Sequence, residues 1–245
     1  LPGNRLGLTD QGVVLRDGLK TQGLEQRIAV LQTYQKTFDA MKLEDLMSKP
    51  VKEGLDRIRG LRVLYLYHNV IDAQGDHPAT ESQAFDAVER TIDELAAAVE
   101  KLVRSYQAAR IFITADHGFL FQINPVAAWD KVESVTGTII DGNHRFVLGK
   151  DLSTPPGSRK WDLSYLGWNG WEAVIPTGLG RFKGSGGGTR FVHGGTMPQE
   201  AVVPVIEYRP LRAREGDHGG PVDVEVVNQG GACVLSHTYA ARRRD

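Results

Sequence analysis

The sequence has 245 residues with 29 basic and 30 acidic side chains, so its formal net charge is −1 at pH 7. This length suits one large domain, and a charge so close to zero excludes a strong general attraction to nucleic acid or to a membrane surface. Apolar stretches fall short of the ~20 residues that cross a bilayer, and the first residues show no signal-peptide pattern. The single cysteine excludes an internal disulfide. We therefore expect a cytoplasmic protein without a membrane partner.

The first third of the chain alternates between polar segments and short apolar runs. Residues 1–20 are polar and rich in glycine, and they predict a loop with one short strand at 12–15. Apolar side chains recur in steps of three and four over residues 24–43, which predicts an amphipathic helix. The short apolar run at 61–67 predicts a buried strand, and the polar residues 72–78 predict a turn at its carboxyl end.

A long helix is predicted over residues 80–105, because its apolar positions hold one stripe through several turns. The apolar run at 109–114 then predicts a second buried strand. Strand, helix and strand in succession indicate a βαβ unit with a right-handed crossover. We therefore expect residues 61–67 and 110–115 to form adjacent or near-adjacent parallel strands.

The middle of the chain, residues 125–189, has no sustained period. Short strands are predicted at 145–148 and 173–175. The glycine-rich run at 184–188 favours a surface hairpin, a lid or the rim of a substrate site, and composition does not separate these three interpretations.

After this region, residues 198–203 predict a short helix with proline near its first position, and residues 205–208 predict a closing strand. The alternation at 222–227 indicates a half-exposed strand. We therefore expect one domain over residues 1–211. Residues 212–245 are expected to form a linker and the start of a further β element, or a disordered tail.

Three polar clusters follow apolar runs, at residues 72–77, at Asp116-His117 and at His193. In an open α/β sheet, ligands bind in the crevice outside the carboxyl ends of the strands, where loops distant in sequence meet. Carboxylates and imidazoles are ligands of zinc and similar divalent ions, and two ions ~4 Å apart can support phosphoryl transfer. Each cluster alone also fits a turn, a cap or an ordinary loop histidine, but together they predict a shared metal centre.

The same clusters lie in segments that resemble motifs of the alkaline phosphatase superfamily. Residues 113–118 (ITADHG) resemble its strand-end Asp-His motif, and residues 190–195 (RFVHGG) are similar to the late His-Gly-Gly motif of its PglZ branch. Residues 67–72 (YHNVID) resemble an intermediate motif of that branch. The matches extend from about residue 60 to 208. They imply an α/β fold, a three-layer sandwich with a mainly parallel central sheet that is truncated at its N-terminus.

Carried over residue by residue, this resemblance implies two divalent metal ions, zinc in the first place, with manganese or magnesium as alternatives. Asp116 and His117 would bind one ion. Asp72 and His193 would bind the other.

The third ligand of the Asp72 ion is left open by the resemblance. The superfamily often has a histidine four residues after this aspartate, but here that position is Asp76, with His77 beside it, and either side chain completes the set. His68 and Asn69, which follow the first strand, are candidates for orienting a ligand from outside the metal's own shell. For His68, simple packing without a function is an equal alternative.

The superfamily also uses a serine or threonine nucleophile and an earlier aspartate on the second metal. In the PglZ pattern the nucleophile precedes a Leu-Leu-Pro segment, and residues 1–3 (Leu-Pro-Gly) are similar to the tail of that segment. Both groups are therefore expected upstream of Leu1, since Thr9 and Thr21 do not match the motif. A start without methionine and an end at 242–245 in Arg-Arg-Arg-Asp likewise predict a piece of a longer protein.

The resemblance implies a metal-dependent phosphohydrolase or phosphodiesterase of bacterial phage defence, because PglZ proteins are associated with the BREX and Pgl systems. It implies a phosphate-ester substrate, such as a nucleotide or nucleic acid, and other defence proteins as partners. This chain, without the nucleophile, is expected to be inactive. Two alternatives stay open, a non-catalytic structural or interaction module and a signalling nucleotide phosphodiesterase. Pure nucleic-acid binding has little support, because the basic run at 242–244 is not interleaved with aromatic residues.

Overall fold

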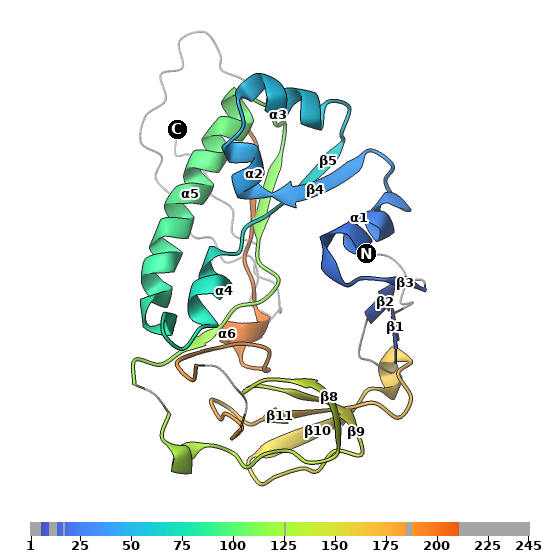
Figure 1. Cartoon of the computed structure of the whole chain (residues 1–245), viewed down its shortest axis with the longest axis vertical. Coiled ribbons are helices and arrows are strands. Elements are labelled where there is room, and N and C mark those ends of the chain that lie inside the picture. The colour runs from blue at the N-terminus through green and yellow to red at the C-terminus, as the bar shows by residue number, and fades with distance from the viewer. Residues whose placement is uncertain (1–5, 10–13, 17, 125, 185–187, 211–245) are drawn as a thin grey trace, which may run out of the picture.

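The computed structural model describes residues 6–9, 14–16, 18–124, 126–184 and 188–210 (Figure 1). The α-helices are α1 (Gly23–Gln32), α2 (Leu43–Met47), α3 (Val51–Ile58), α4 (Val70–Gly75), α5 (Ala84–Arg104) and α6 (Pro198–Ala201). Three 3-10 turns are η1 (Glu81–Gln83), η2 (Ala128–Asp130) and η3 (Ser164–Leu166). The strands are β1 (Leu6–Leu8), β2 (Val14–Arg16), β3 (Leu19–Lys20), β4 (Phe38–Lys42), β5 (Val63–Tyr67), β6 (Ile111–Thr114), β7 (Leu120–Phe121), β8 (Thr138–Gly142), β9 (Val147–Lys150), β10 (Ser158–Asp162), β11 (Glu172–Pro176), β12 (Phe191–Val192) and β13 (Val205–Tyr208).

The strands form mixed and mostly antiparallel sheets. The largest sheet has the order β10-β11-β9-β8 and is antiparallel throughout, as is the sheet β1-β2-β3. The pairs β12-β7 and β13-β6 are antiparallel, whereas β4 and β5 run parallel. The chain thus combines helices and strands as an α/β protein, but the described sheets do not confirm a mainly parallel central sheet.

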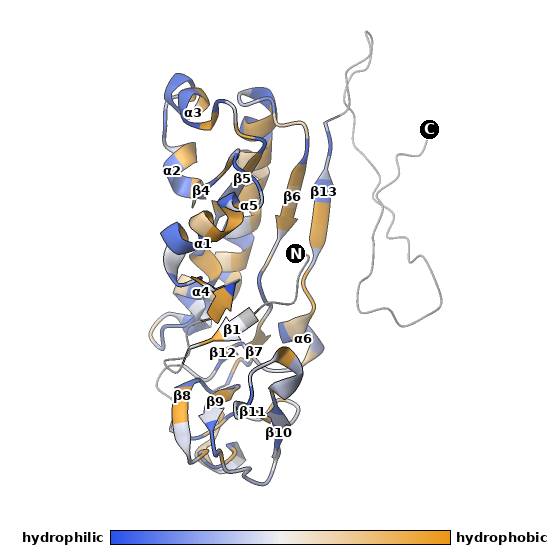
Figure 2. Cartoon of the chain, turned by 90° about the vertical axis from the view of Figure 1, so that its right-hand side faces the viewer, coloured by the Kyte–Doolittle hydropathy of each residue, from blue (hydrophilic) through white to orange (hydrophobic). Residues whose placement is uncertain are grey.

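Helix α5 joins β5 to β6, as the predicted strand-helix-strand order requires. The helix itself is confirmed, but the face expected to be buried is wrong. The buried positions are Ala84, Ala87, Thr91 and Ala98, whereas Phe85 and Ile92 of the predicted apolar stripe are exposed. Within the described residues, however, β5 hydrogen-bonds to β4 and β6 hydrogen-bonds to β13, so the two strands of this unit do not pair with each other. Figure 2 shows β6 and β13 side by side along the molecule.

The predicted helix over residues 24–43 is wrong in its second half. Helix α1 ends at Gln32, and the chain then enters β4. Phe38 and Met41 are three residues apart and so fit a helical stripe, yet both are buried in the strand with the residues between them. Pairing with β5 therefore overrides the local period, which a short apolar run cannot define.

The strands predicted at 61–67 and 109–114 are found as β5 and β6, but the prediction that they are buried is wrong, since both keep exposed and partly exposed residues. The other predicted elements are found with shifted ends. The turn predicted at 72–78 is largely helix α4 and its C-terminal residues, and the strands predicted near 145–148 and 173–175 are β9 and β11. The helix after residue 197 and the strand at 205–208 are confirmed as α6 and β13. Several predictions lie partly or wholly outside the described residues: positions 12–13 of the first strand, 185–187 of the glycine-rich run, and the segment 212–245 with its strand at 222–227.

Two hydrophobic clusters stabilise different ends of the molecule. One cluster underlies the four-stranded sheet and contains Val135, Val147, Leu152, Val174 and Phe182. The other contains Met41, Leu46 and Tyr106, where α2 and β4 pack near the C-terminal end of α5. Figure 1 shows α4 and α6 between the helical part of the chain and the four-stranded sheet.

The strands β5, β6 and β13 keep large apolar side chains exposed, which Figure 2 shows as apolar colouring along β6 and β13. Val63, Phe112, Val205 and Ile206 are exposed members of this set. Large exposed apolar surfaces are uncommon on monomers and typify surfaces that other protein segments cover. Among the described residues, no helix has both the length and the apolar character needed to cross a membrane.

Candidate metal centre

Helix α4 presents two aspartates on one face. The chain leaves β5 through His68-Asn69 and enters α4, whose first turn carries Asp72. Asp76 follows at the C-terminal end of the helix, with its backbone N–H donating to the Asp72 carbonyl at 2.9 Å. Residues four apart lie one above the other on a helix, so Asp72 and Asp76 point to the same side.

The end of β6 brings the second cluster to this face. The His117 Nε2 atom lies 3.6 Å from Asp72 Oδ2 and 3.9 Å from Asp116 Oδ1. One ligand atom from each of Asp72, Asp116 and His117 lies within 4.8 Å of the others. Ligands that are ~2 Å from one ion stand ~3–4 Å apart, so small side-chain rotations would bring these three atoms to a shared ion.

The third cluster arrives on β12, which pairs with β7. His193 follows this strand, and its Nε2 atom lies 3.3 Å from Asp76 Oδ1. The imidazole rings of His117 and His193 stack, with centroids 4.1 Å apart and planes inclined by 6°. Loops separated by more than a hundred residues in sequence therefore meet in one basin.

The structure groups these residues differently from the family resemblance. Asp72 lies with Asp116 and His117, while Asp76 lies with His193. His77 is exposed, and its Nδ1 atom accepts a hydrogen bond from the Ala79 N–H at 3.3 Å. Between the two open alternatives for the third ligand, the geometry thus favours Asp76.

The two residues predicted to orient a ligand, His68 and Asn69, form hydrogen bonds with residues outside the candidate ligand set. His68 Nε2 is 2.7 Å from Glu94 Oε2 on α5. Asn69 is exposed at the position before α4, where its carbonyl accepts a hydrogen bond from the Ala73 N–H. The contact of His68 with Glu94 does not decide between the packing and ligand-orienting interpretations, and both stay predictions.

Comparison with known proteins identifies the family of this arrangement. A family model described as "BREX system PglZ alkaline phosphatase-like domain" matches residues 1–208. The chain belongs to the PglZ family. It is 38% identical over 222 residues to the "Alkaline phosphatase-like protein BrxZ" of Escherichia coli O9:H4 (strain HS), covering 86% of this chain and 25% of that protein. It is 35% identical over 243 residues to the "Alkaline phosphatase-like protein PglZ" of Bacillus cereus (strain H3081.97), covering 98% of this chain and 28% of that protein. The chain therefore spans about a quarter of the length of these relatives.

The electrostatics of the basin in this PglZ-family chain centre on Asp72. Burial raises the pKa of its carboxyl, and the neighbouring carboxylates of Asp76 and Asp116 act in the same direction. The imidazoles of His117 and His193 oppose this shift and lower the pKa. A divalent cation would replace that repulsion by attraction, so the set of side chains fits a metal better than it fits the metal-free state.

Hydrogen bonding also prepares His117 for a metal. Its Nδ1 atom lies 3.1 Å from the Gly118 carbonyl, a contact that assigns the ring proton to Nδ1 and leaves Nε2 with a free lone pair. Metal-ligating histidines commonly donate their other ring N–H to a backbone carbonyl in this way. Asp116, in contrast, has a side chain that is 86% exposed, so one side of the basin is open to solvent.

Sequence reasoning missed the residues that hold these loops. Asn143 donates from Nδ2 to the His193 carbonyl at 3.2 Å, and the buried Glu81 accepts the N–H groups of Arg190 and Phe191 at 2.9 and 3.4 Å. Asn143 lies in the irregular region, where no sequence signal marked it. Glu200 also holds this segment, since its Oε1 atom accepts the Gly195 N–H at 3.0 Å. It lies shortly after the recognised His-Gly-Gly segment, and that position could have drawn attention to it.

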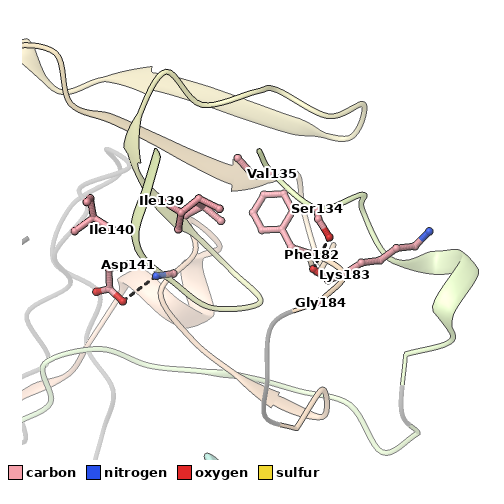
Figure 3. A pocket seen from close by; sticks show the side chains of 10 residues that line it. Ser134, Val135, Ile139, Ile140, Asp141, Phe182, Lys183 and Gly184 are labelled. Atoms are coloured by element: carbon pink, nitrogen blue, oxygen red, sulfur yellow. Dashed lines mark hydrogen bonds between the residues drawn. The ribbon is translucent and has the colours of Figure 1, made fainter. Parts of the chain in front are cut away.

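A separate pocket lies beside strands β8 and β9 of the four-stranded sheet (Figure 3). Ile139 and Asp141 of β8 line it together with Ser134, Phe182 and Lys183. The lining includes none of the six candidate ligands. Its lining is partly apolar and partly polar, and the Lys183 ammonium forms an ion pair with Glu133. The basin around His117, and not this pocket, therefore carries the candidate chemistry.

Proposed function

We propose that this chain supplies the metal-binding part of a metal-dependent phosphohydrolase of the phosphodiesterase type in a bacterial phage-defence protein. The observation that carries the proposal is the convergence of Asp72, Asp116 and His117, whose ligand atoms lie within 4.8 Å of one another. Membership in the BREX-associated PglZ family supports the same chemistry. Cytoplasmic defence proteins are the partners that this proposal implies.

Two divalent ions fit the donor set, zinc in the first place, with manganese or magnesium as alternatives. Asp72, Asp116 and His117 would hold one ion, and Asp76 and His193 would contribute to the other. Bound ions of this kind polarise a phosphoryl oxygen and favour the deprotonated form of an attacking hydroxyl. The stacked imidazoles keep the two groups of ligands side by side.

We propose further that the chain alone does not turn over substrate. The hydroxyl of Thr21 donates to the Val14 carbonyl at 2.8 Å within the N-terminal sheet. Thr114, at the end of β6, is exposed, and its hydroxyl contacts the Ala115 carbonyl at 3.4 Å. Neither matches the nucleophile motif that the family resemblance implies. In a phosphoryl-transfer site, nucleophile and metal ligands act as a unit, so ligands without the nucleophile should give little rate enhancement.

The test is an assay against a generic aryl phosphodiester with added zinc or manganese. The 245-residue chain is compared with a longer protein in which a segment carrying the nucleophile motif, as the family resemblance implies it, precedes Leu1. We expect hydrolysis by the longer protein and its loss in the longer protein carrying His117→Ala. Equal turnover by both forms would contradict the proposed inactivity of the chain, and no turnover by the longer protein at any metal concentration would contradict the enzymatic function.

A second candidate function is a non-catalytic interaction module, which the exposed apolar side chains of β5, β6 and β13 favour. Metal analysis separates the two, since an interaction module needs no stoichiometric divalent ion. The nature of the phosphate ester is also a proposal. We favour a nucleotide or nucleic acid diester, and a panel of nucleic acids and signalling dinucleotides given to the longer protein distinguishes a nuclease from a signalling phosphodiesterase.

A further inference from the structure

The segment that carries His193 has little secondary structure of its own. β12 is two residues long, and Gly194 follows His193 with a φ angle of +97°. Glycine at such an angle gives a tight turn but adds conformational freedom. The position of His193 must therefore be set by contacts from outside the segment.

The side chain of Glu200 supplies such contacts from α6. One carboxylate oxygen accepts the Gly195 N–H at 3.0 Å, and the other accepts the Met197 N–H at 3.2 Å. Both oxygens also accept hydrogen bonds from Arg145, through Nε and Nη2, each at 2.8 Å. Four donors thus surround one carboxylate, which fixes the turn directly after His193.

Arg145 is as deeply buried as its partner, since both side chains have zero exposure. Its remaining donors bind the carbonyls of Gly178 and Gly180, so the guanidinium anchors Glu200 to the four-stranded sheet part of the chain. A side chain at position 195 would clash with the guanidinium, because a Cβ built on Gly195 would lie 2.5 Å from Arg145 Nη2. A buried ion pair often adds little to the free energy of unfolding, because removing two charges from water is costly. Its best-attested role is to select one packing arrangement of the segments that it joins.

The backbone of Glu200 reaches the other metal loop. Its carbonyl accepts the Gly118 N–H at 2.9 Å, one residue after His117. Gly118 packs so closely on the Gln199 carbonyl that any side chain there would overlap it. One residue therefore holds the His193 turn with its carboxylate and the Asp116-His117 loop with its carbonyl.

From these contacts we infer that Glu200, oriented by Arg145, is a positioning residue that sets the separation of the two metal-binding loops. The inference rests on the proposed metal centre and assigns Glu200 no contact with an ion or a substrate. Substitution of the Glu200 carboxylate should loosen both metal-binding loops and weaken metal binding. Substitution of a residue that contacts only one of these loops should loosen that loop alone.

The experiment uses the full 245-residue chain and the variant Glu200→Gln, which keeps the side-chain shape but places an amide N–H₂ opposite existing donors. Amide hydrogen exchange is measured without metal, and Mn²⁺ affinity is measured by titration calorimetry. We expect exchange at Gly195 and Met197 to rise by about tenfold or more, with a smaller rise at Gly118. Mn²⁺ affinity should fall by about 10–100-fold.

Two glutamates provide matched controls. Glu81→Gln alters a buried carboxylate of η1 that accepts the N–H groups of Arg190 and Phe191, so it should speed exchange at those two residues and leave exchange at Gly118 unchanged. Glu172→Gln alters a carboxylate of β11 that binds the Leu152 N–H and Lys160 far from the basin, and it should leave Mn²⁺ affinity unchanged.

The outcomes separate this inference from the proposed function. Unchanged exchange at Gly118 and Gly195 in Glu200→Gln, or loosened loops with unchanged Mn²⁺ affinity, would overturn the role of Glu200. If the single variant does not fold, the double variant Arg145→Met with Glu200→Leu removes both charges and is measured instead, with the same expectations. Absence of Mn²⁺ binding by the unsubstituted chain would refute the metal centre itself, and the inference with it.

Discussion

Gly75 is the point at which α4 contacts the strand before His193, and we expect Gly75→Ala to separate Asp76 from His193. Gly75 is buried, and a Cβ built on it would lie 2.5 Å from the Cγ and Cδ1 atoms of Phe191. Non-bonded carbon atoms pack at about 3.5–4.0 Å, so the helix and the ring must move apart by about 1 Å. Asp76 is carried by the helix and His193 by the strand, so their 3.3 Å contact would be lost.

The change in the free energy of unfolding caused by Gly75→Ala has two opposing contributions. Overpacking of this kind costs about 1–3 kcal/mol, and alanine in a helix recovers about 1 kcal/mol relative to glycine. Stability should therefore fall by only about 0–2 kcal/mol. Metal ligands tolerate displacements of only about 0.2 Å, so Mn²⁺ affinity should fall by about tenfold or more.

Urea denaturation measures the stability change, and titration calorimetry with Mn²⁺ measures the affinity. Gly7→Ala is the matched control, because a Cβ at Gly7 would make an ordinary 3.4 Å contact with the Cβ of Leu15. If Gly75→Ala bound Mn²⁺ as tightly as Gly7→Ala did, the close approach of α4 to Phe191 would not be what sets the ligand spacing.

Burial raises the pKa of the Asp72 carboxyl above its unfolded value of about 3.9, so the folded state binds the proton more tightly and loses stability as pH rises between those two pKa values. At a pH above the raised pKa, metal-free Asp72→Asn should therefore be more stable than the unsubstituted chain. At a pH below the unfolded pKa, this gain in stability should disappear, as urea denaturation at several pH values would show. Because Mn²⁺ competes with this proton, its affinity for the unsubstituted chain should decline as pH falls toward the raised pKa, and a pH-independent affinity would argue against Asp72 as a ligand. Asp76→Ala should weaken Mn²⁺ binding and His77→Ala should not, and the reverse order in calorimetry would return His77 to the ligand set. Leu46→Ala should lower the free energy of unfolding by about 2–5 kcal/mol because Leu46 is fully buried, and a loss below about 1 kcal/mol would contradict the packing of that core.

The candidate site could be outlined from sequence because its residues follow apolar runs and match motifs with fixed spacing. The long helix was equally accessible, since its stripe persists through several turns. Strand β4 was not, because five residues are too few to distinguish a strand from a helical stripe and its partner β5 lies 21 residues further on.

The contact of Asp76 with His193 could not be predicted from the sequence, because it depends on α4 being a helix. The sequence predicted a turn at residues 72–78, and a turn does not define the directions of the Asp76 and His77 side chains. Arg145 and Glu200 were missed for a different reason. They are 55 residues apart, and their ion pair depends on how the antiparallel sheet packs against α6, which no local pattern encodes.

The most direct test of the metal centre is anomalous X-ray diffraction from crystals of this chain grown with Zn²⁺, with data collected on both sides of the zinc absorption edge. The proposal predicts an anomalous peak ~2 Å from the Nε2 atom of His117 and from carboxylate oxygens of Asp72 and Asp116. A crystal grown with Zn²⁺ that shows no anomalous peak between these three side chains, or shows its peak at His77 instead, would contradict the proposed metal centre.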